Sequence, residues 1–417
     1  MTFTRSLIGA AASVVAAAFA AAPAWSQSAA TATKPATAPM DITKEERAAL
    51  LPVQQAIKAQ DWAAAKAALP AAVQAARSPD AQYAVGRFEL EIGLGANNVA
   101  MQARGLDHLI ASGRVPATDL PVIYRNRAVL ANNAGDKRGA ETAFAKVVAL
   151  TPRDPEALVS LAQVKKDLNK LPEAVELMQR AIDIKRAAGT PVDETWYKYT
   201  LKLAYDGRSD ARLRQAAQTL SRQLIAVYPT KDNWRDALLI LRDTAGLDAA
   251  AELDLLRLMR ASGALAGERD WYDLAQGLAT AGNYAEAKAV LDDGIAKGSI
   301  DPKKAAFAEL LGAVGARLGG AREALSGDEA KAMAAANGAL ALKAGDAWEG
   351  HGDHARAIAL YRVALRKGGV DPDAVNTHLA VALLASGDRA GAESLFKSLK
   401  GSRKELGAFW VLWLHKS

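Results

Sequence analysis

The sequence predicts an all-α fold in which helical hairpins stack on one another to form a solenoid. Half of the 417 residues are hydrophobic, yet only 6% are aromatic, and alanine supplies much of the apolar content. Alanine is the strongest helix former, and its small side chain lets helices pack closely. A sequence pattern also recurs along the chain with a spacing of 34 residues, which is typical of stacked helical repeats.

The recurring pattern joins a turn to a helix. A Gly or Asn and a short polar stretch lead to an Ala, and a large apolar residue follows four positions later. Ala140 and Ala174, which lie 34 residues apart, belong to two consecutive copies. The five copies begin at Gly135, Asn169, Gly282, Gly352 and Gly387, and they place Ala140, Ala174, Ala287, Ala357 and Ala392 at the shared position. We expect the first residue to end the turn and the Ala to lie where the second helix crosses the first.

These residues resemble the tetratricopeptide repeat, a 34-residue helix–turn–helix unit with small and large residues at fixed positions. The resemblance implies a right-handed α-solenoid whose concave face is lined by the first helix of each hairpin. Diverged units are predicted at residues 196–229, 234–263 and 303–336, the last with Gly319-Gly320 as its turn. Each hairpin buries its apolar faces against its neighbours, so stability is expected to be a sum of nearest-neighbour terms.

The N-terminus has the features of a secretory signal peptide. Arg5 precedes an apolar run from Leu7 to Ala22, and small residues follow at positions that a signal peptidase reads. An uncleaved membrane anchor is the alternative. The predicted organisation is a signal peptide at 1–26, a flexible linker at 27–42, an N-terminal helical capping region at 43–120, repeats at 121–302, C-terminal repeats at 303–400 and an aromatic capping helix at 401–417. We therefore expect a periplasmic or secreted bacterial protein with no transmembrane segment in its mature chain.

The predicted last helix gathers the aromatic residues Phe409, Trp410 and Trp413. An open repeat end exposes apolar surface and needs a cover, so we interpret this helix as a cap. The alternative is an exposed element that docks a partner or a membrane surface.

Chemistry-bearing motifs are sparse. The net charge of +6 is spread among 46 acidic residues, so we expect no nucleic-acid partner. The sequence has no cysteine, and His351, Asp353 and His354 form its only histidine cluster, on a predicted turn. We predict no metal, no cofactor and no enzymatic activity. A pocket with converging titratable groups around His108 or around His351 and His354 would instead favour an enzyme.

A binding surface remains as the functional candidate. The repeat alignment places these residues near the concave face: Arg125, Val129, Asn132, Gln163, Lys166, Tyr197, Tyr272 and Gln276, with Tyr199 as a further candidate. The Lys/Asn clamp with which chaperone-binding relatives hold a C-terminal carboxylate is not reproduced. We predict a non-enzymatic scaffold of the bacterial envelope that binds a peptide or partner protein. The alternatives are a component of an export or assembly machine for exopolysaccharide or outer-membrane proteins, and an enzyme with an unrecognised helical site. The sequence leaves the partner and the oligomeric state open.

Overall fold

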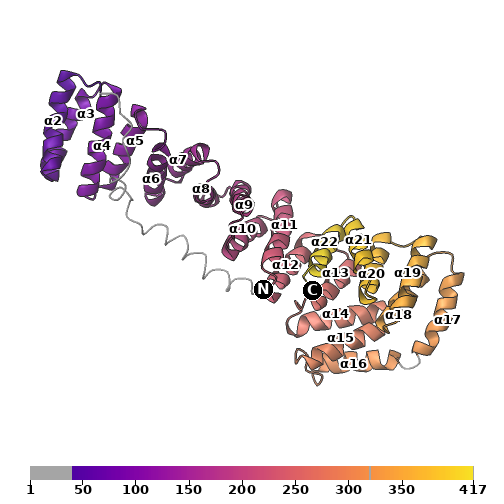
Figure 1. Cartoon of the computed structure of the whole chain (residues 1–417). Coiled ribbons are helices and arrows are strands. Elements are labelled where there is room, and N and C mark those ends of the chain that lie inside the picture. The colour runs from indigo at the N-terminus through magenta and orange to yellow at the C-terminus, as the bar shows by residue number, and fades with distance from the viewer. Residues whose placement is uncertain (1–39, 319–320, 417) are drawn as a thin grey trace. The chain divides into compact units, whose positions relative to one another are not determined.

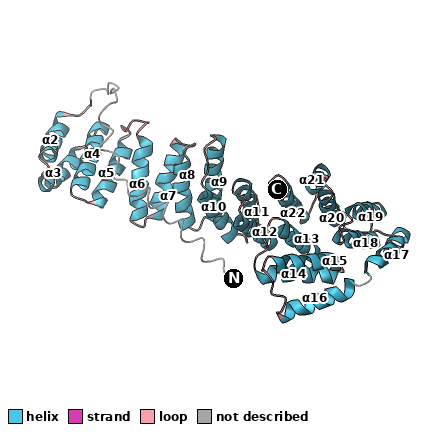
Figure 2. Ribbon diagram, turned by 60° about the horizontal axis from the view of Figure 1, so that its bottom comes forward, coloured by secondary structure: helices cyan, strands magenta, loops and turns pink. Residues whose placement is uncertain are grey.

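The computed structural model describes residues 40–318 and 321–416, and its regular elements in these ranges are all helices (Figure 2). The all-α class and the solenoid of helical hairpins are thereby confirmed. The predicted signal peptide, most of the predicted linker and the Gly319-Gly320 turn lie outside the described residues. Within the described ranges, no helix combines the length and the apolar character needed to cross a membrane.

The chain divides into two compact units, and the division falls between Gly207 and Arg208. This point lies inside the diverged repeat predicted at residues 196–229, and not at a predicted domain boundary. The boundaries predicted at 120, 302 and 400 stay predictions.

Unit 1, up to Gly207, consists of successive antiparallel hairpins in which each helix packs mainly against its neighbours in sequence (Figure 1). Its helices are α2 (Lys44–Lys58), α3 (Trp62–Ala75), α4 (Pro79–Gly95), α5 (Val99–Ser112), α6 (Leu120–Asn133), α7 (Lys137–Leu150), α8 (Pro155–Asp167), α9 (Leu171–Ala187) and α10 (Glu194–Asp206).

Unit 2, from Arg208 onward, continues with hairpins and adds contacts between helices that are distant in sequence. Its helices are α11 (Ala211–Val227), α12 (Lys231–Thr244), α13 (Ala249–Ala261), α14 (Gly267–Ala281), α15 (Tyr284–Ala296), α16 (Ala305–Leu318), α17 (Ala321–Ala334), α18 (Ala339–Gly350), α19 (His354–Lys367), α20 (Pro372–Ala385), α21 (Arg389–Ser398) and α22 (Arg403–Leu414).

The turn residues of the five aligned repeats adopt the left-handed backbone conformation. Gly135, Gly282, Gly352 and Gly387 have φ between 78° and 93°, and Asn169 takes the same place with φ 58°. Glycine adopts this conformation without a Cβ penalty, and asparagine tolerates it better than most residues. An Asp often follows, as at Asp136, where its carboxylate caps the next helix. This turn chemistry explains why the hairpins end where the pattern predicts.

The five aligned alanines lie on the second helix of each hairpin, and each is completely buried. Their exposed fraction is 0%, and they belong to α7, α9, α15, α19 and α21. Because Ala is the smallest residue with a Cβ, it sets a short distance between crossing helices. The predicted role of this position is confirmed.

The two units distribute their apolar cores differently. In unit 1, buried apolar side chains form successive clusters, one within α2–α5 and another within α6–α9. In unit 2, buried apolar side chains from Ile225 to Leu414 form one continuous cluster.

The C-terminal helix α22 closes unit 2. It packs against α21 and α20, as a cap would, and also against α11 and α13 near the start of the unit (Figure 1). Trp410 stacks on Phe396 with ring centroids 5.2 Å apart, and Phe409 meets Trp234 edge-on at 6.4 Å. The indole nitrogen of Trp413 donates to the carbonyl of Ala261 at 3.2 Å. The aromatic helix is therefore packed within unit 2, and its role as a cap stays a prediction.

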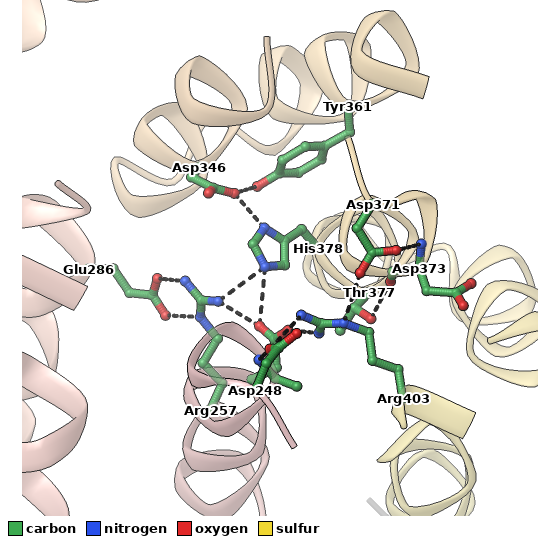
Figure 3. Close-up of polar contacts among 12 residues, drawn as sticks. Asp248, Arg257, Glu286, Asp346, Tyr361, Asp371, Asp373, Thr377, His378 and Arg403 are labelled. Atoms are coloured by element: carbon green, nitrogen blue, oxygen red, sulfur yellow. Dashed lines mark hydrogen bonds and ion pairs between the residues drawn. The ribbon is translucent and has the colours of Figure 1, made fainter. Parts of the chain in front are cut away.

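One hairpin departs from regular stacking. Helices α16 and α17 contact each other less than the helices of neighbouring hairpins do, and α15 packs directly against α18. Glu286 of α15 and Asp346 of α18 belong to the same charged cluster (Figure 3).

Candidate functional site

A chain of polar side chains connects alternate helices of unit 1. We call it the polar ladder, and its members are Asn132, Lys137, Gln163, Lys166, Asp167 and Tyr199. The polar ladder begins at the end of α6 and the start of α7, continues on α8 and ends on α10.

Asp167 is the centre of the polar ladder. Lys137 Nζ donates to Asn132 Oδ1 at 2.7 Å and to Asp167 Oδ2 at 3.0 Å. Lys166 Nζ and Gln163 Nε2 donate to Asp167 Oδ1 at 2.9 and 3.1 Å. Although burial opposes the shift, the hydrogen bonds from both lysines hold the pKa of Asp167 below its ordinary value. The carboxylate therefore stays charged at neutral pH.

Tyr199 ends the polar ladder on α10. Its hydroxyl donates to Gln163 Oε1 at 2.6 Å. Burial, together with the nearby charge of Asp167, raises the pKa of Tyr199 to about 12. The phenol is thus a neutral hydrogen-bond donor throughout the physiological range.

The structure brings several predicted surface residues together and separates others. Asn132, Gln163 and Lys166 meet in the polar ladder. Arg125 lies two turns before Asn132 on α6, where it pairs with Asp154 at 2.6 Å. Val129, between them on the same helix, is half-buried against a neighbouring apolar cluster.

The prediction for Tyr197 is wrong. Its side chain is only 1% exposed and forms part of the core, so it is not presented on a surface. Successive helical residues are separated by about 100° around the axis. Tyr197 and Tyr199, two positions apart, therefore point to different sides of α10.

The remaining predicted residues lie in unit 2. Tyr272 packs edge-on against Phe307 with ring centroids 5.6 Å apart. Gln276 is exposed and donates to Thr280 Oγ1 at 3.3 Å, one turn along α14.

A second polar cluster, which the sequence analysis missed, lies inside unit 2. We call it the buried ion network, and it consists of Asp254, Arg257, Glu286, Asp346, Tyr361, His378 and Arg403 (Figure 3). These residues come from α13, α15, α18, α19, α20 and α22.

Asp254 is the anion at the centre of the buried ion network, and its side chain is 1% exposed. Oδ1 accepts from Arg257 Nη1 at 2.7 Å and from His378 Nε2 at 3.1 Å, and Oδ2 accepts from Arg403. Burial raises the pKa of a carboxyl group, but the positive charges of His378, Arg257 and Arg403 outweigh this and hold the pKa of Asp254 below its ordinary value. A charged Asp254 thereby joins α13 to α20 and α22.

His378 lies between two carboxylates. Nδ1 is 2.6 Å from Asp346 Oδ1, and Nε2 faces Asp254 Oδ1 (Figure 3). Burial would lower the pKa of His378, but the charges of Asp346 and Asp254 outweigh burial and raise the pKa to about 10. Both ring nitrogens therefore act as donors, and the imidazolium has no free lone pair for proton abstraction or for binding a metal.

A cavity of about 430 Å³ opens beside the buried ion network. Asp254, Arg257, Glu286, Asp346, Tyr361 and His378 contribute to its wall. Titratable groups thus converge on a pocket around His378, whereas the sequence pattern indicated His108, or His351 and His354. His354 reaches this region only through Glu349, which lines the cavity and lies 2.9 Å from its Nδ1.

Two sequence signals could have indicated the buried ion network. Asp254 interrupts the leucine-rich face of α13, and His378 adjoins Leu379 and Ala380 on α20. Charged residues inside apolar runs are seldom buried unless they have partners. Within the described ranges, no group of His, Cys, Asp or Glu side chains is arranged to hold a metal ion.

The repeat pattern, its left-handed turn residues and its buried crossing alanines define the class. The chain is an all-α protein of stacked helical hairpins, and its repeat resembles the tetratricopeptide repeat. No family model matches the sequence. Cellulose synthase operon protein C of Xanthomonas axonopodis pv. citri is 30% identical over 292 residues, which cover 64% of this chain and 18% of that protein. The chain thus spans less than a fifth of the curated relative that it matches.

Solved repeat structures are similar to this chain at low identity. A tetratricopeptide repeat protein from Parabacteroides merdae is 12% identical, with a TM-score of 0.29 over 82% of this chain and 100% of that one. Pseudomonas aeruginosa pilF is 17% identical, with a TM-score of 0.21 over 44% of this chain and 92% of that one.

Proposed function

We propose that the chain is a non-enzymatic protein-interaction scaffold of the bacterial cell envelope, and that it binds a peptide segment or partner helix along α6, α8 and α10 of unit 1. The polar ladder carries this proposal. It presents donors and acceptors at successive hairpin positions, and a stacked array repeats such positions along its length.

The polar ladder keeps capacity for further hydrogen bonds. The exposed fractions of the side chains are 40% for Lys166, 34% for Lys137 and 23% for Asp167. An extended peptide carries one backbone donor and one acceptor per residue, so it can exchange bonds with several ladder positions at once. The two carboxylates that face the ring nitrogens of His378 support a structural role for the charged cluster of unit 2.

We further propose a place in an exopolysaccharide assembly machine as the particular setting of this scaffold. The similarity to cellulose synthase operon protein C supports it. The N-terminal pattern of Arg5 followed by an apolar run supports export to the envelope.

Site-specific photocrosslinking tests the scaffold. A photoreactive amino acid replaces Lys166 in the polar ladder, Gln276 on α14, or Lys146, an exposed position on α7 that serves as the control. We expect a discrete adduct from position 166 that is absent from position 146. Equal adduct patterns at the ladder and the control would contradict the proposal. Adducts that contain an exopolysaccharide-assembly protein would support the particular setting.

A further inference from the structure

The cavity of unit 2 has the size and partial exposure of a ligand site. Its volume of about 430 Å³ falls within the usual range for small-molecule pockets. Three wall carboxylates are partly open to solvent: the exposed fractions are 14% for Asp346, 18% for Glu349 and 20% for Glu286. The polar wall can therefore be reached from outside.

Acidic side chains outnumber basic ones around the cavity. Five of its lining residues are Asp or Glu, whereas two are Arg and one is His. Even with His378 protonated, the wall carries more negative than positive formal charge. Such a cavity favours a positively charged occupant.

The basic groups of the wall already have partners. Arg257 forms a two-point pair with Glu286, through Nε at 2.9 Å and Nη2 at 2.7 Å, and its Nη1 donates to Asp254. Both nitrogens of His378 face carboxylates. Arg260, the other arginine of the wall, donates to Asp293 through Nε at 3.2 Å and to the carbonyl of Ala289 through Nη2 at 3.4 Å. Each basic group of the wall thus already faces an acceptor.

Acceptor capacity, by contrast, remains. Asp346 uses Oδ1 for both Tyr361 and His378, and Glu349 uses Oε2 for His354. Among the described residues, Asp346 Oδ2 and Glu349 Oε1 have no hydrogen-bond partner. Burial, with a contribution from the charge of Glu286, raises the pKa of Glu349, as expected for a carboxyl group that lacks sufficient positive charge nearby.

The lining of the cavity also has apolar members, which include Trp410, Ala261 and Val381. The indole N–H of Trp410 is buried and has no acceptor among the described residues. A lining that combines an aromatic side chain with carboxylate oxygens able to accept suits a flat organic cation better than a metal ion. A metal would require several oxygen ligands within about 2–2.6 Å of one point.

We propose that this cavity binds an organic cation, a guanidinium group, through the carboxylates of Asp346 and Glu349. The N–H groups of such a cation reach separated acceptors, so the two carboxylates can share it. The cation belongs either to a free small molecule or to a basic side chain of a partner protein. The site is independent of the polar ladder in unit 1.

Calorimetric titration of the full chain tests this proposal. L-arginine is compared with L-citrulline, which has nearly the same shape but an uncharged side chain. The peptide Gly-Gly-Arg-Gly-Gly is compared with its citrulline counterpart. We expect each arginine ligand to bind at least roughly tenfold more tightly than its citrulline partner, since a charge-assisted hydrogen bond is lost.

Matched variants locate the binding. Glu349→Gln is expected to weaken arginine binding roughly tenfold, and Glu309→Gln, at an exposed position of α16 outside the cavity, is expected to leave it unchanged. Asp346→Asn provides a second variant, and circular dichroism confirms that each variant is folded. If free arginine binds more tightly than the arginine peptide, the ligand is a small molecule. If the peptide binds more tightly than free arginine, the ligand is a side chain of a partner protein. Equal binding of arginine and citrulline, or no effect of either cavity variant, would overturn the proposal.

Discussion

Units 1 and 2 consist of the same kind of helical hairpin, but the contacts between their helices differ. In unit 1, helices contact their neighbours in sequence, and apolar clusters follow one another along the chain. In unit 2, α22 returns to α11 and α13, where Arg222 pairs with Glu405, 183 residues away. A side chain in unit 1 therefore stabilises mainly its own and adjacent hairpins, whereas one in the closure of unit 2 stabilises both ends of that unit together.

Both units bury charges, but they partner them over different separations along the chain. In unit 1, Glu89 is 2% exposed and pairs with His108, 19 residues away. A desolvated charge requires a partner. In unit 2, Asp254 and Arg403, with side chains 1% and 3% exposed, form such a pair across 149 residues.

Asp254→Asn is expected to give the largest effect. The substitution removes the anion shared by Arg257, His378 and Arg403, and loss of one partner of a buried ion pair costs about 3–5 kcal/mol. Hydrogen exchange should accelerate in α13, α20 and α22 while unit 1 remains unchanged.

The matched control for Asp254→Asn is Asp292→Asn, which alters an exposed carboxylate paired with Lys288 one turn away. We expect this control to change the unfolding free energy by less than about 1 kcal/mol. Similar effects of the two substitutions would show that Asp254 does not hold the closure.

Alkaline pH is expected to give the second largest effect, and only in unit 2. The folded state raises the pKa of His378 from its ordinary 6.5 to about 10, with Asp346 and Asp254 as the facing anions and Arg257 as the nearby cation. The stabilisation is therefore complete below pH 6.5 and is lost as the pH rises toward 10. The unfolding free energy of unit 2 should fall by roughly 1 kcal/mol per pH unit between pH 7 and 9.

Acid should destabilise unit 1, as it should unit 2 through Asp254, whose pKa is also lowered. The backbone amide of Ser78 donates a hydrogen bond to the carboxylate of Glu46, and the backbone amides of Thr43 and Arg77 donate to it as well. Together these hydrogen bonds lower the pKa of Glu46 to about 2. This stabilisation is complete above pH 4.5 and is lost as the pH falls toward 2. Hydrogen exchange of the two units at pH 3, 7 and 9 checks both signs, and His378→Gln should flatten the alkaline slope. An unchanged slope in that variant would assign the titration to another group.

The fold could be predicted from the sequence because a repeat is a local signal. Each repeat of about 34 residues contains its own turn residue, small residue at the helix crossing and apolar faces, so every repeat indicates the same helical hairpin. Closure by α22 could not be predicted in this way. The contacts of Arg403 with Asp254 and of Trp413 with Ala261 span 149 and 152 residues, and no repeat period encodes them.

The same difference between local and long-range contacts applies to the candidate sites. Asn132, Gln163 and Lys166 were predicted because helical spacing and repeat alignment fix their faces. Tyr197 was misplaced because it lies in a diverged unit, where the repeat alignment does not fix the face of α10 on which it falls. The buried ion network was missed because its members come from six helices that only the closed unit brings together.

Ala140→Leu should have a smaller, local effect in unit 1. Ala140 is completely buried at a helix crossing, so the added atoms overpack the site at a cost of about 1–3 kcal/mol. Ala145→Leu, on the exposed side of the same helix, is the control and should be nearly neutral. Hydrogen exchange should rise in α6 to α9 and not in unit 2. Destabilisation that spreads equally through both units would contradict the nearest-neighbour behaviour of unit 1.

Tyr199→Phe should give the smallest effect, because it removes one hydrogen bond from a half-exposed ladder. The loss of the bond to Gln163 is expected to cost about 0.5–1.5 kcal/mol, measured by urea unfolding. Tyr124→Phe is the control: Tyr124 is also half-buried in unit 1, and its hydroxyl makes no hydrogen bond within the described part of the chain. A double-mutant cycle with Gln163→Ala isolates the pair, and a coupling energy of zero would remove Tyr199 from the polar ladder. We compare this coupling energy with the loss of unfolding free energy in Asp254→Asn. If the coupling energy is much the smaller of the two, unit 1 can exchange the hydrogen bonds of its polar ladder for those of a partner without unfolding. That property distinguishes a surface suited to binding from a network that maintains closure.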